Sequence, residues 1–453
     1  MNSRLTMNLG IRYDYQTVPI EVHGNFYSRG QPFGFGPVQP EGSLYNADYT
    51  GFGPRFGFAY VLDQRGKTVL RGGAAILTNP RPGFDNFLEV AQNGLLQPRR
   101  YRFSAAEVQQ YGLLYAGLSN ASTLPIVLNN PNFPWGQDAI NPHFPNPKSY
   151  NWNLGIQREL TQNLVLDVAY VGTRGVHSNY GTENNQVNPL TGQYPIAGFG
   201  AFRYYTADGS SEYHALQAAL RKRFSQNFQF NISYTYASDV AVGPGDFVAS
   251  SSAQDTQGSG AINMTRQDDV GPPLYAAKSV FVSNFLYELP FERLHRSNSR
   301  GSQLLLRGWQ FSGIFTGSTG LPFQILQSST LVNSRPDYIG GDPILSNYSS
   351  TLQYLNPAAF AKVPVAAISG ATIRAGTVGR DDVRGPGMWN LDAALSKNFA
   401  ISERVRLQVR SDMFNSLNHT NLTSVSANIT SGNFGRLTAA TARTVQFNAR
   451  LTF

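Results

Sequence analysis

The last ten residues of the chain, 444–453, alternate strictly between polar and apolar side chains and read T-V-Q-F-N-A-R-L-T-F. Successive side chains of a β-strand point to opposite faces, so this segment predicts a strand with one polar and one apolar face. The chain stops on the aromatic residue Phe453, with no polar tail after it. A strand between lipid and a polar lumen, with an aromatic side chain at the interface, is typical of transmembrane β-barrels.

The same period-two alternation recurs along the chain and predicts twelve strands, an even number. In residues 404–414, for example, Leu407 and Val409 oppose Arg406 and Arg410. The predicted strands cover residues 5–15, 52–62, 67–77, 150–160, 164–170, 213–224, 228–236, 278–289, 304–315, 389–399, 404–414 and 444–453.

The connections between these segments alternate in length. The connections after the second, fourth, sixth, eighth and tenth predicted strands are short turns, except residues 290–303. The others are long and rich in glycine and proline: residues 17–51, 78–149, 172–212, 237–277, 316–388 and 415–443. Short periplasmic turns and long extracellular loops are the pattern of outer-membrane barrels. The sequence therefore predicts an all-β, antiparallel transmembrane outer-membrane β-barrel with about twelve strands, long extracellular loops and a periplasmic C-terminus.

The composition agrees with this fold class. Charged residues make up 14% of the 453 residues and hydrophobic residues 41%, whereas about 25% of residues are charged in typical soluble domains. No segment approaches the ~18 consecutive apolar residues of a membrane helix. Cysteine is absent, which excludes disulfides, thiol catalysis and cysteine-ligated metals.

The sequence gives no support for an enzyme, a cofactor site or a nucleic-acid partner. The net charge is +8, but the basic residues form no dense patch of the kind that binds nucleic acid. The six histidines have no metal-binding spacing. Two acidic pairs in loops, at residues 268–269 and 381–382, could hold a cation, but we expect them to be solvated loop acids.

Polar-face arginines predict the register of the barrel wall. An arginine facing lipid costs about 2–4 kcal/mol at the membrane midplane, so these residues should face a lumen. They either pair with carboxylates and water as a structural lining, or they take part in substrate passage or plug contact. The lumen-facing candidates are Arg12, Arg404, Arg406, Arg410, Asp412 and Arg450.

Three tryptophans lie near predicted strand ends: Trp152, Trp309 and Trp389. Tryptophan concentrates at membrane–water interfaces, so we expect these residues to form an interface girdle. A platform on which a ligand stacks is the alternative use of such residues, and nothing else in the sequence favours it.

Several stretches, in this order along the chain, resemble the C-terminal barrel portion of TonB-dependent receptors, in particular the Oar-like group. They are L-T-M-N-L-G-I-R-Y-D-Y at 5–15, Y-N-W-N-L-G-I-Q-R-E-L at 150–160, A-Y-V-G-T-R-G at 169–175, Y-H-A-L-Q-A-A-L-R-K-R-F at 213–224, R-G-P-G-M-W-N-L-D at 384–392, D-M-F-N-S-L-N-H-T-N at 412–421 and F-G-R-L-T at 434–438. The resemblance covers nearly the whole chain. It is more specific for the superfamily than for the subgroup.

The resemblance implies a plugged barrel of 22 strands in the outer membrane of a Gram-negative bacterium. It implies that an unknown ligand binds the surface loops and the plug, and that the TonB energy-coupling complex acts on the plug. It also implies that the barrel-assembly machinery recognises the last strand through Val445, Phe447, Leu451 and Phe453. The other expected partner is outer-membrane lipid.

The chain departs from that family pattern in two respects: it has about twelve strands, and it has no plug domain. We therefore expect residues 1–453 to be the C-terminal portion of a receptor barrel, with the plug and the N-terminal strands absent from this chain. A passive outer-membrane pore closed from twelve strands is one alternative. An adhesion or structural outer-membrane protein that uses its long loops is another.

Overall fold

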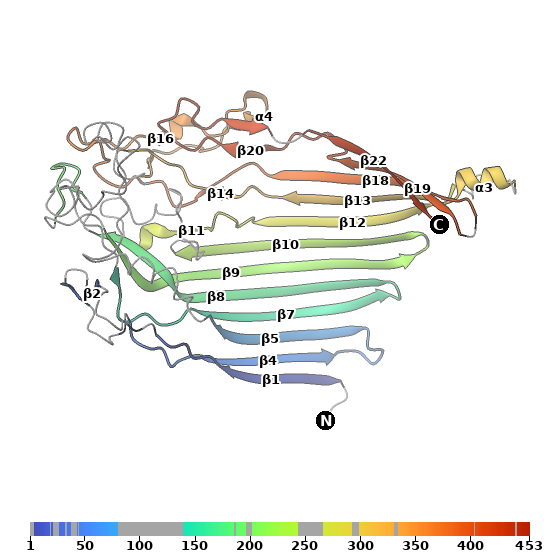
Figure 1. The fold of residues 1–453 in the computed structure, drawn as a ribbon, viewed down its shortest axis with the longest axis horizontal. Coiled ribbons are helices and arrows are strands. Elements are labelled where there is room, and N and C mark those ends of the chain that lie inside the picture. The colour runs from blue at the N-terminus through green and yellow to red at the C-terminus, as the bar shows by residue number, and fades with distance from the viewer. Residues whose placement is uncertain are drawn as a thin grey trace, which may run out of the picture.

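The computed structural model shows a chain made almost entirely of antiparallel strands (Figure 1). The structure describes residues 4–18, 20, 27–31, 34–37, 43, 45–79, 139–184, 187–195, 202–242, 266–291, 299–329, 334–402, 404–439 and 442–453. Parts of the predicted loops 17–51, 78–149, 172–212, 237–277, 316–388 and 415–443 therefore lie outside the described residues.

One large sheet dominates the fold. Twelve of its strands follow one another in chain order, each antiparallel to the next, and this confirms the predicted fold class. They are β1 (Leu5–Tyr13), β4 (Phe52–Val61), β5 (Thr68–Thr78), β7 (Lys148–Thr161), β8 (Leu164–Asn184), β9 (Phe202–Ser225), β10 (Phe228–Val242), β12 (Ser279–Leu289), β13 (Trp309–Ser318), β18 (Met388–Ala400), β19 (Arg406–Phe414) and β22 (Thr444–Thr452).

Short elements complete the described fold. Two strands join the large sheet beside this path: β6 (Ala139–Ile140) on β9 and β11 (Val270–Gly271) on β10. Four small two-stranded sheets lie in the loops: β2 (Tyr27–Gln31) with β3 (Gly34–Pro37), β14 (Pro322–Phe323) with β17 (Val383–Arg384), β15 (Asp337–Tyr338) with β16 (Phe360–Ala361), and β20 (Leu422–Val425) with β21 (Leu437–Ala439). The helical elements are η2 (Arg266–Asp269), α3 (Arg300–Leu306), α4 (Tyr348–Thr351) and η4 (Pro357–Ala359).

The register of the sheet separates polar from apolar side chains across many strands. Residues paired directly across neighbouring strands share a face. A row across β13, β18, β19 and β22 is polar: Gln310, Ser396, Arg410 and Asn448. A row on the opposite face, across β10, β12, β13 and β18, is apolar: Phe228, Tyr287, Phe311 and Leu395. We call these the polar face and the apolar face of the sheet.

The apolar face is exposed in the isolated chain. Leu9 in β1 and Phe447 in β22 are each 77% exposed. Exposed apolar patches this extensive mark a surface that another apolar phase covers. A lipid bilayer is the phase that the strand pattern predicts.

The two ends of the sheet differ as the connection lengths predicted. In Figure 1 the described parts of the long connections lie at one end of the strands and the tight turns at the other, where β1 begins and β22 ends. The turn between β9 and β10 consists of Gln226 and Asn227, which have φ values of 53° and 63°. Positive φ at both positions gives a turn whose twist matches that of the strands.

One turn breaks the pattern and carries helix α3, so the prediction of a strand from residue 304 was wrong. The side chain of Ser299 accepts a hydrogen bond from the Ser302 amide and caps the helix at its start. Gly308, at φ 79°, then turns the chain into β13. Helix α3 lies at the turn end of the sheet (Figure 1). Within the described part of the chain, every helix is too short or too polar to cross a membrane.

The sheet has two open edges. Strand β1 pairs only with β4 and strand β22 only with β19, so the first and last strands do not pair with each other in the described structure. An unpaired edge in lipid leaves backbone N–H and C=O groups without partners, at a cost of several kcal/mol for each group. The twelve strands therefore form a barrel wall that is not closed.

Segments between β13 and β18 and after β19 pack together into a small unit, which we call the loop domain (described residues of 319–387 and 415–439). It has its own hydrophobic core, whereas the apolar face of the sheet is exposed. The buried members of this core are Ile325, Tyr354, Leu355, Ala359, Phe360, Val378, Val383, Phe434 and Leu437.

Two adjacent residues of β7 test the assignment of the faces. Ile156 lies on the apolar face opposite Val168, and Gln157 lies on the polar face opposite Asp167. We expect Ile156→Arg to lower the free energy of unfolding in lipid vesicles by about 2–4 kcal/mol, because the new charge faces lipid. Gln157→Arg should be close to neutral, since the new guanidinium lies beside Asp167. Urea titration followed by heat-modifiable gel mobility measures both, and equal losses would contradict the assignment.

Candidate functional site

The arginines predicted to line a lumen lie on the polar face. Arg410 pairs through Nε with Oδ1 of Asp412 at 2.7 Å, and the Asn448 side chain donates to Oδ2 of the same carboxylate at 2.9 Å. Arg12 pairs with Asp14, the residue just after the end of β1, at 2.7 Å. Arg406, Arg450 and, just before β19, Arg404 are exposed and fall on the same face by alternation.

These ion pairs neutralise charge along the strand rather than stabilise the fold, because exposed pairs contribute little. Carboxylate pairing of the arginines, one of the two expected uses, is thus present for Arg12 and Arg410. That the polar face borders a lumen stays a prediction.

The three tryptophans lie on the apolar face at both ends of the strands. Trp152 and Trp389 are near the loop end, and Trp309 starts β13 at the turn end. Trp309 pairs with Lys397, eight residues along β18 from Trp389. Eight residues span about 26 Å along a strand, or roughly 20 Å along the membrane normal at the usual tilt, near the ~25 Å apolar band of barrels. The spacing between Trp309 and Trp389 along the membrane normal supports an interface girdle, which stays a prediction.

The residues expected to be recognised during assembly lie on the last strand, at the open edge. The side chains of Val445, Phe447 and Leu451 are exposed on the apolar face, and Phe453 is 93% exposed at the end of the chain. Within the described part of the chain nothing covers them, so they are accessible to a partner there. Recognition by the assembly machinery stays a prediction.

The structure also contains a site that the sequence did not predict, a cavity of about 450 Å³ between the loop domain and the ends of β13 and β18. We call it the rim cavity. Ser318 and Met388, which line it, are paired with each other as the last residue pair of these two strands, and both lie on the polar face. The cavity therefore opens at the loop end of the polar face.

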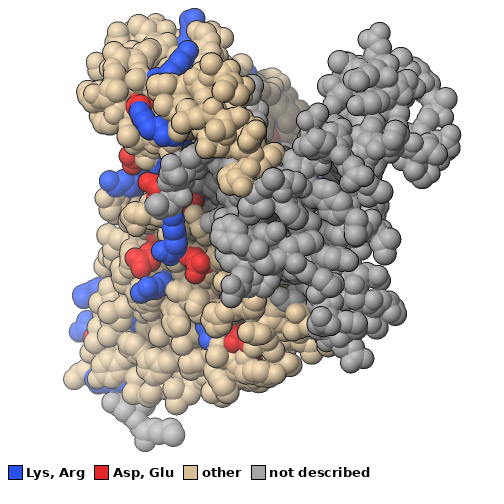
Figure 2. All heavy atoms as spheres, turned by 90° about the vertical axis from the view of Figure 1, so that its left-hand side faces the viewer, with Lys and Arg blue, Asp and Glu red and all other residues tan. Residues whose placement is uncertain are grey.

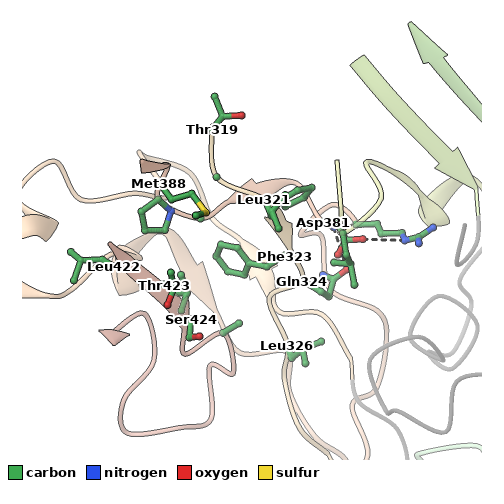
Figure 3. A pocket seen from close by; sticks show the side chains of 18 of the residues that line it. Thr319, Leu321, Phe323, Gln324, Leu326, Asp381, Met388, Leu422, Thr423 and Ser424 are labelled. Atoms are coloured by element: carbon green, nitrogen blue, oxygen red, sulfur yellow. Dashed lines mark hydrogen bonds and ion pairs between the residues drawn. The ribbon is translucent and has the colours of Figure 1, made fainter. Parts of the chain in front are cut away.

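Apolar and polar side chains both line the rim cavity, and Thr423 and Ser424 lie beside Leu422 (Figure 3). The apolar side chains that line it are Leu274, Leu321, Pro322, Phe323, Leu326, Pro386, Met388, Leu422, Val425 and Ala427. In Figure 3, Met388 and Leu422 lie at one end, whereas Gln324 and Asp381 lie at the other. A mostly apolar pocket with a few convergent polar groups is the usual form of a small-molecule site.

A buried cluster of acidic and basic side chains forms the polar end. The Tyr180 hydroxyl donates to Oδ2 of Asp269 at 2.7 Å. Arg380 donates to the Asp269 carbonyl at 2.9 Å and pairs through Nε with Oδ2 of Asp381 at 3.4 Å. Arg335 donates at 3.0 Å to the carbonyl of the residue before Asp269.

The expectation that the two acidic pairs are solvated was wrong for one member of each. Asp269 is 1% exposed and Asp381 is 3% exposed. Arg335 and Arg380 donate to the backbone carbonyls of residues 268 and 269, and Arg380 also pairs with Asp381. Each carboxylate thus has guanidinium groups close by.

Burial dominates the electrostatics of Asp269. It raises the pKa of this carboxyl, while the Tyr180 hydroxyl and the nearby Arg380 and Arg335 charges act in the opposite direction. Its Oδ1 atom is buried without a hydrogen-bond partner in the described structure. No group of three or more acidic or histidine side chains among the described residues could hold a metal ion.

The backbone that carries Arg335 is held by an ion pair beside the cavity. Arg374 donates through both terminal nitrogens to the two carboxylate oxygens of Asp337 at 2.7 Å, and the Thr377 amide donates to Oδ1. The hydrogen bond from Arg374 is the main cause that lowers the pKa of Asp337. The pair joins segments that are 37 residues apart in sequence.

Comparisons with known proteins identify the kind of fold. A family model described as an outer membrane beta barrel domain matches residues 1–446. The fold resembles that of the outer membrane transporter YddB from Escherichia coli, with a TM-score of 0.50 and 11% identity, over 90% of this chain and 41% of that one.

A weaker similarity, with a TM-score of 0.44 and 10% identity, links the chain to BauA, the ferric preacinetobactin receptor from Acinetobacter baumannii, over 99% of this chain and 40% of that one. The chain thus spans about two fifths of the length of these proteins. No curated protein sequence matches it.

The Asp337–Arg374 pair predicts how the loop domain responds to acid. Because the folded pKa of Asp337 is lowered, its contribution to stability is present above the unfolded value, about 3.9, and is lost as the pH falls through the folded pKa. Hydrogen exchange of residues 334–380 should therefore be faster in Arg374→Gln than in the wild type at pH 7, and this difference should disappear near pH 2.

Lys362→Gln serves as the control for this prediction. It removes a cation of the same domain that forms no ion pair among the described residues, so its exchange rates should follow the wild type. A difference between Arg374→Gln and the wild type that is independent of pH would contradict the role of the ion pair.

Proposed function

Because the chain belongs to the family of outer membrane beta barrel domains, we propose that it forms the C-terminal portion of a TonB-dependent receptor of the Oar-like group. The family resides in the outer membrane of Gram-negative bacteria. In this proposal the long loops capture a ligand, and the ligand then passes along the polar face into the cell by uptake that the TonB complex energises through a plug.

The observation that carries the proposal is the position of the rim cavity. It lies where the loop domain meets the polar face, at the pair Ser318 and Met388. A ligand bound there has contact with the loops on one side and with the polar face on the other. In this proposal, a ligand captured by the loops would pass from this place onto the polar face.

The open edges support the proposal that the chain is one portion of a larger barrel. Strands β1 and β22 each have one unpaired side in the described structure. Further strands that pair with both edges would remove the cost of these unpaired groups. The length agrees, since the chain covers 41% of the transporter whose fold it resembles.

The DNA upstream of the Met1 codon tests this proposal. We expect an uninterrupted reading frame that encodes further strands with period-two alternation and, before them, a plug domain with an energy-coupling segment. An in-frame stop codon directly upstream, together with a separate start signal at Met1, would contradict the proposal.

Bilayer conductance distinguishes the proposal from a passive pore. The purified chain alone should give no stable single-channel current in a planar bilayer, because a wall with two open edges encloses no channel. A steady conductance would favour a pore closed from these twelve strands if it changed in Gln157→Arg. It should then stay the same in Ile368→Ser, a substitution in an exposed loop.

A further inference from the structure

We infer that the turn end of the wall is a docking surface for anionic phospholipid. In this arrangement helix α3 lays Leu304 and Leu305 into the lipid layer, and arginines at the same end pair with headgroup phosphates. The inference rests on the proposed function, because it needs the chain to be a barrel wall in a membrane. It goes beyond that function by naming a lipid class and the element that contacts it.

Basic residues outnumber acidic ones at the turn end. We compared the residues with described side chains that lie in the turns, just before β1, or among the last four residues at a strand's turn end. The basic ones are Arg4, Arg65, Lys67, Arg71, Arg158, Lys222, Arg223, Arg307, Lys397, Arg404, Arg406 and Arg450, and the acidic ones are Asp63, Glu159, Asp167 and Glu288. Figure 2 looks onto the opposite, loop end and shows Lys and Arg intermixed with Asp and Glu, for the atoms that are described. A field of one sign attracts the opposite charge, so the turn end favours an anionic partner.

Two exposed arginines at this end are placed to contact headgroups. Arg158 lies on the apolar face, two residues beyond Ile156 and opposite Leu166, and Arg307 follows α3. Neither guanidinium forms an ion pair or a hydrogen bond within the described structure. A charge on the lipid face costs little only near the interface. Phosphate groups lie there, and a guanidinium binds phosphate through parallel N–H donors.

Two lysines of the same end, by contrast, have partners inside the protein. The Lys222 ammonium donates to the Ser225 carbonyl at 2.7 Å, to Ser225 Oγ at 2.8 Å and to the Phe228 carbonyl at 2.8 Å. Its long apolar stem lets the charge bend back toward the turn in this way. Lys397 is 3% exposed, and its ammonium donates to the Arg307 carbonyl. These lysines stabilise the turn end, and the two arginines are left to contact lipid.

Helix α3 is tied to the wall at the turn end (Figure 1). Besides the bond from Lys397, the Trp309 indole Nε1 donates to the Leu305 carbonyl at 2.9 Å. The Asn398 amide donates to the Gly308 carbonyl at 2.9 Å, so the pairing with β18 continues to a residue just after the helix. These bonds fix the orientation of α3 relative to β13 and β18.

Two leucines of α3 remain exposed although the helix is tied down. Leu304 is 37% exposed and Leu305 is 65% exposed. Trp309, a residue type that concentrates at the membrane interface, bonds to the backbone of Leu305, so the leucines continue the apolar face at that level. An interfacial helix binds lipid through buried apolar side chains together with the attraction of basic residues to anionic headgroups. The leucines beside Arg307 provide this combination.

A fluorophore on a single cysteine tests whether α3 lies in lipid. The chain has no cysteine, so Leu305→Cys labelled with nitrobenzoxadiazole reports this position alone. Leu190→Cys is the matched control, since Leu190 is 64% exposed and lies in the connection between β8 and β9 at the loop end. In vesicles of phosphatidylcholine and phosphatidylglycerol, spin-labelled lipid should quench the label at position 305, and aqueous iodide should quench the label at position 190.

Spin-labelled lipids measure the contribution of the arginines. We expect the lipid whose motion is restricted beside the full chain to be enriched in phosphatidylglycerol over phosphatidylcholine. The double variant Arg158→Gln/Arg307→Gln should lower this preference about two- to fivefold, because each basic residue near the surface attracts anionic lipid. Arg174→Gln is the control: Arg174 also lies on the apolar face, but at the loop end and paired with Glu212 at 3.6 Å, so the preference should not change.

A third labelled position separates failure of this inference from failure of the proposed function. Ile232→Cys, on the apolar face of β10 opposite Leu220, should be quenched by lipid if the chain is a membrane wall. Lipid quenching at position 232 together with iodide quenching at position 305 would overturn the inference alone, because α3 would then face water. An unchanged lipid preference in the double arginine variant would also overturn it. Iodide quenching at both positions would overturn the proposed function as well. Heat-modifiable gel mobility shows that each variant is folded.

Discussion

The structure depends on one constraint, the need of every backbone N–H and C=O group in lipid for a hydrogen-bond partner inside the protein. The twelve strands meet it between neighbours by pairing in chain order, without a crossover. In each strand, every second side chain then faces lipid. The alternation of polar and apolar residues in the sequence follows from this. The two edges, β1 and β22, are where the constraint is not met within the described chain.

The polar face and the loop domain follow from the same constraint. Arginines are tolerated in the wall because the register keeps them on the polar face, where Arg12 and Arg410 pair with carboxylates two residues further along the chain. Beyond the membrane the backbone can bond to water, so the chain is free to build irregular structure. There the loop domain buries a core of its own, and the rim cavity forms where that core meets the last pair of wall residues.

The sequence predicted the wall well because lipid imposes a period of two on every strand that crosses it. Each of the twelve predicted segments corresponds to a strand. The prediction failed where lipid no longer acts: β8 and β9 continue to Asn184 and back from Phe202, through Gly- and Ser-containing stretches that alternate poorly. It also failed at α3, where three consecutive leucines carry no strand period.

The candidate site could not be predicted in the same way. Arg380, which donates to the backbone carbonyl of Asp269, is 111 residues away in sequence, and the packing of the loop domain brings the two together. No local pattern around residues 268–269 or 381–382 distinguishes a buried acid from a solvated one. The only signal in the sequence was the presence of paired acids in loops, and buried and solvated acids share that signal.

Cysteine labelling along one strand tests most directly the central claim, that the polar face borders water and the apolar face borders lipid. The chain contains no cysteine, so single substitutions at residues 229–234 of β10 give an unambiguous background. In native outer membranes a water-soluble maleimide should label positions 229, 231 and 233, and spin-labelled lipid should quench a fluorophore at positions 230, 232 and 234. Labelling without a period of two, or with the two faces exchanged, would contradict the account.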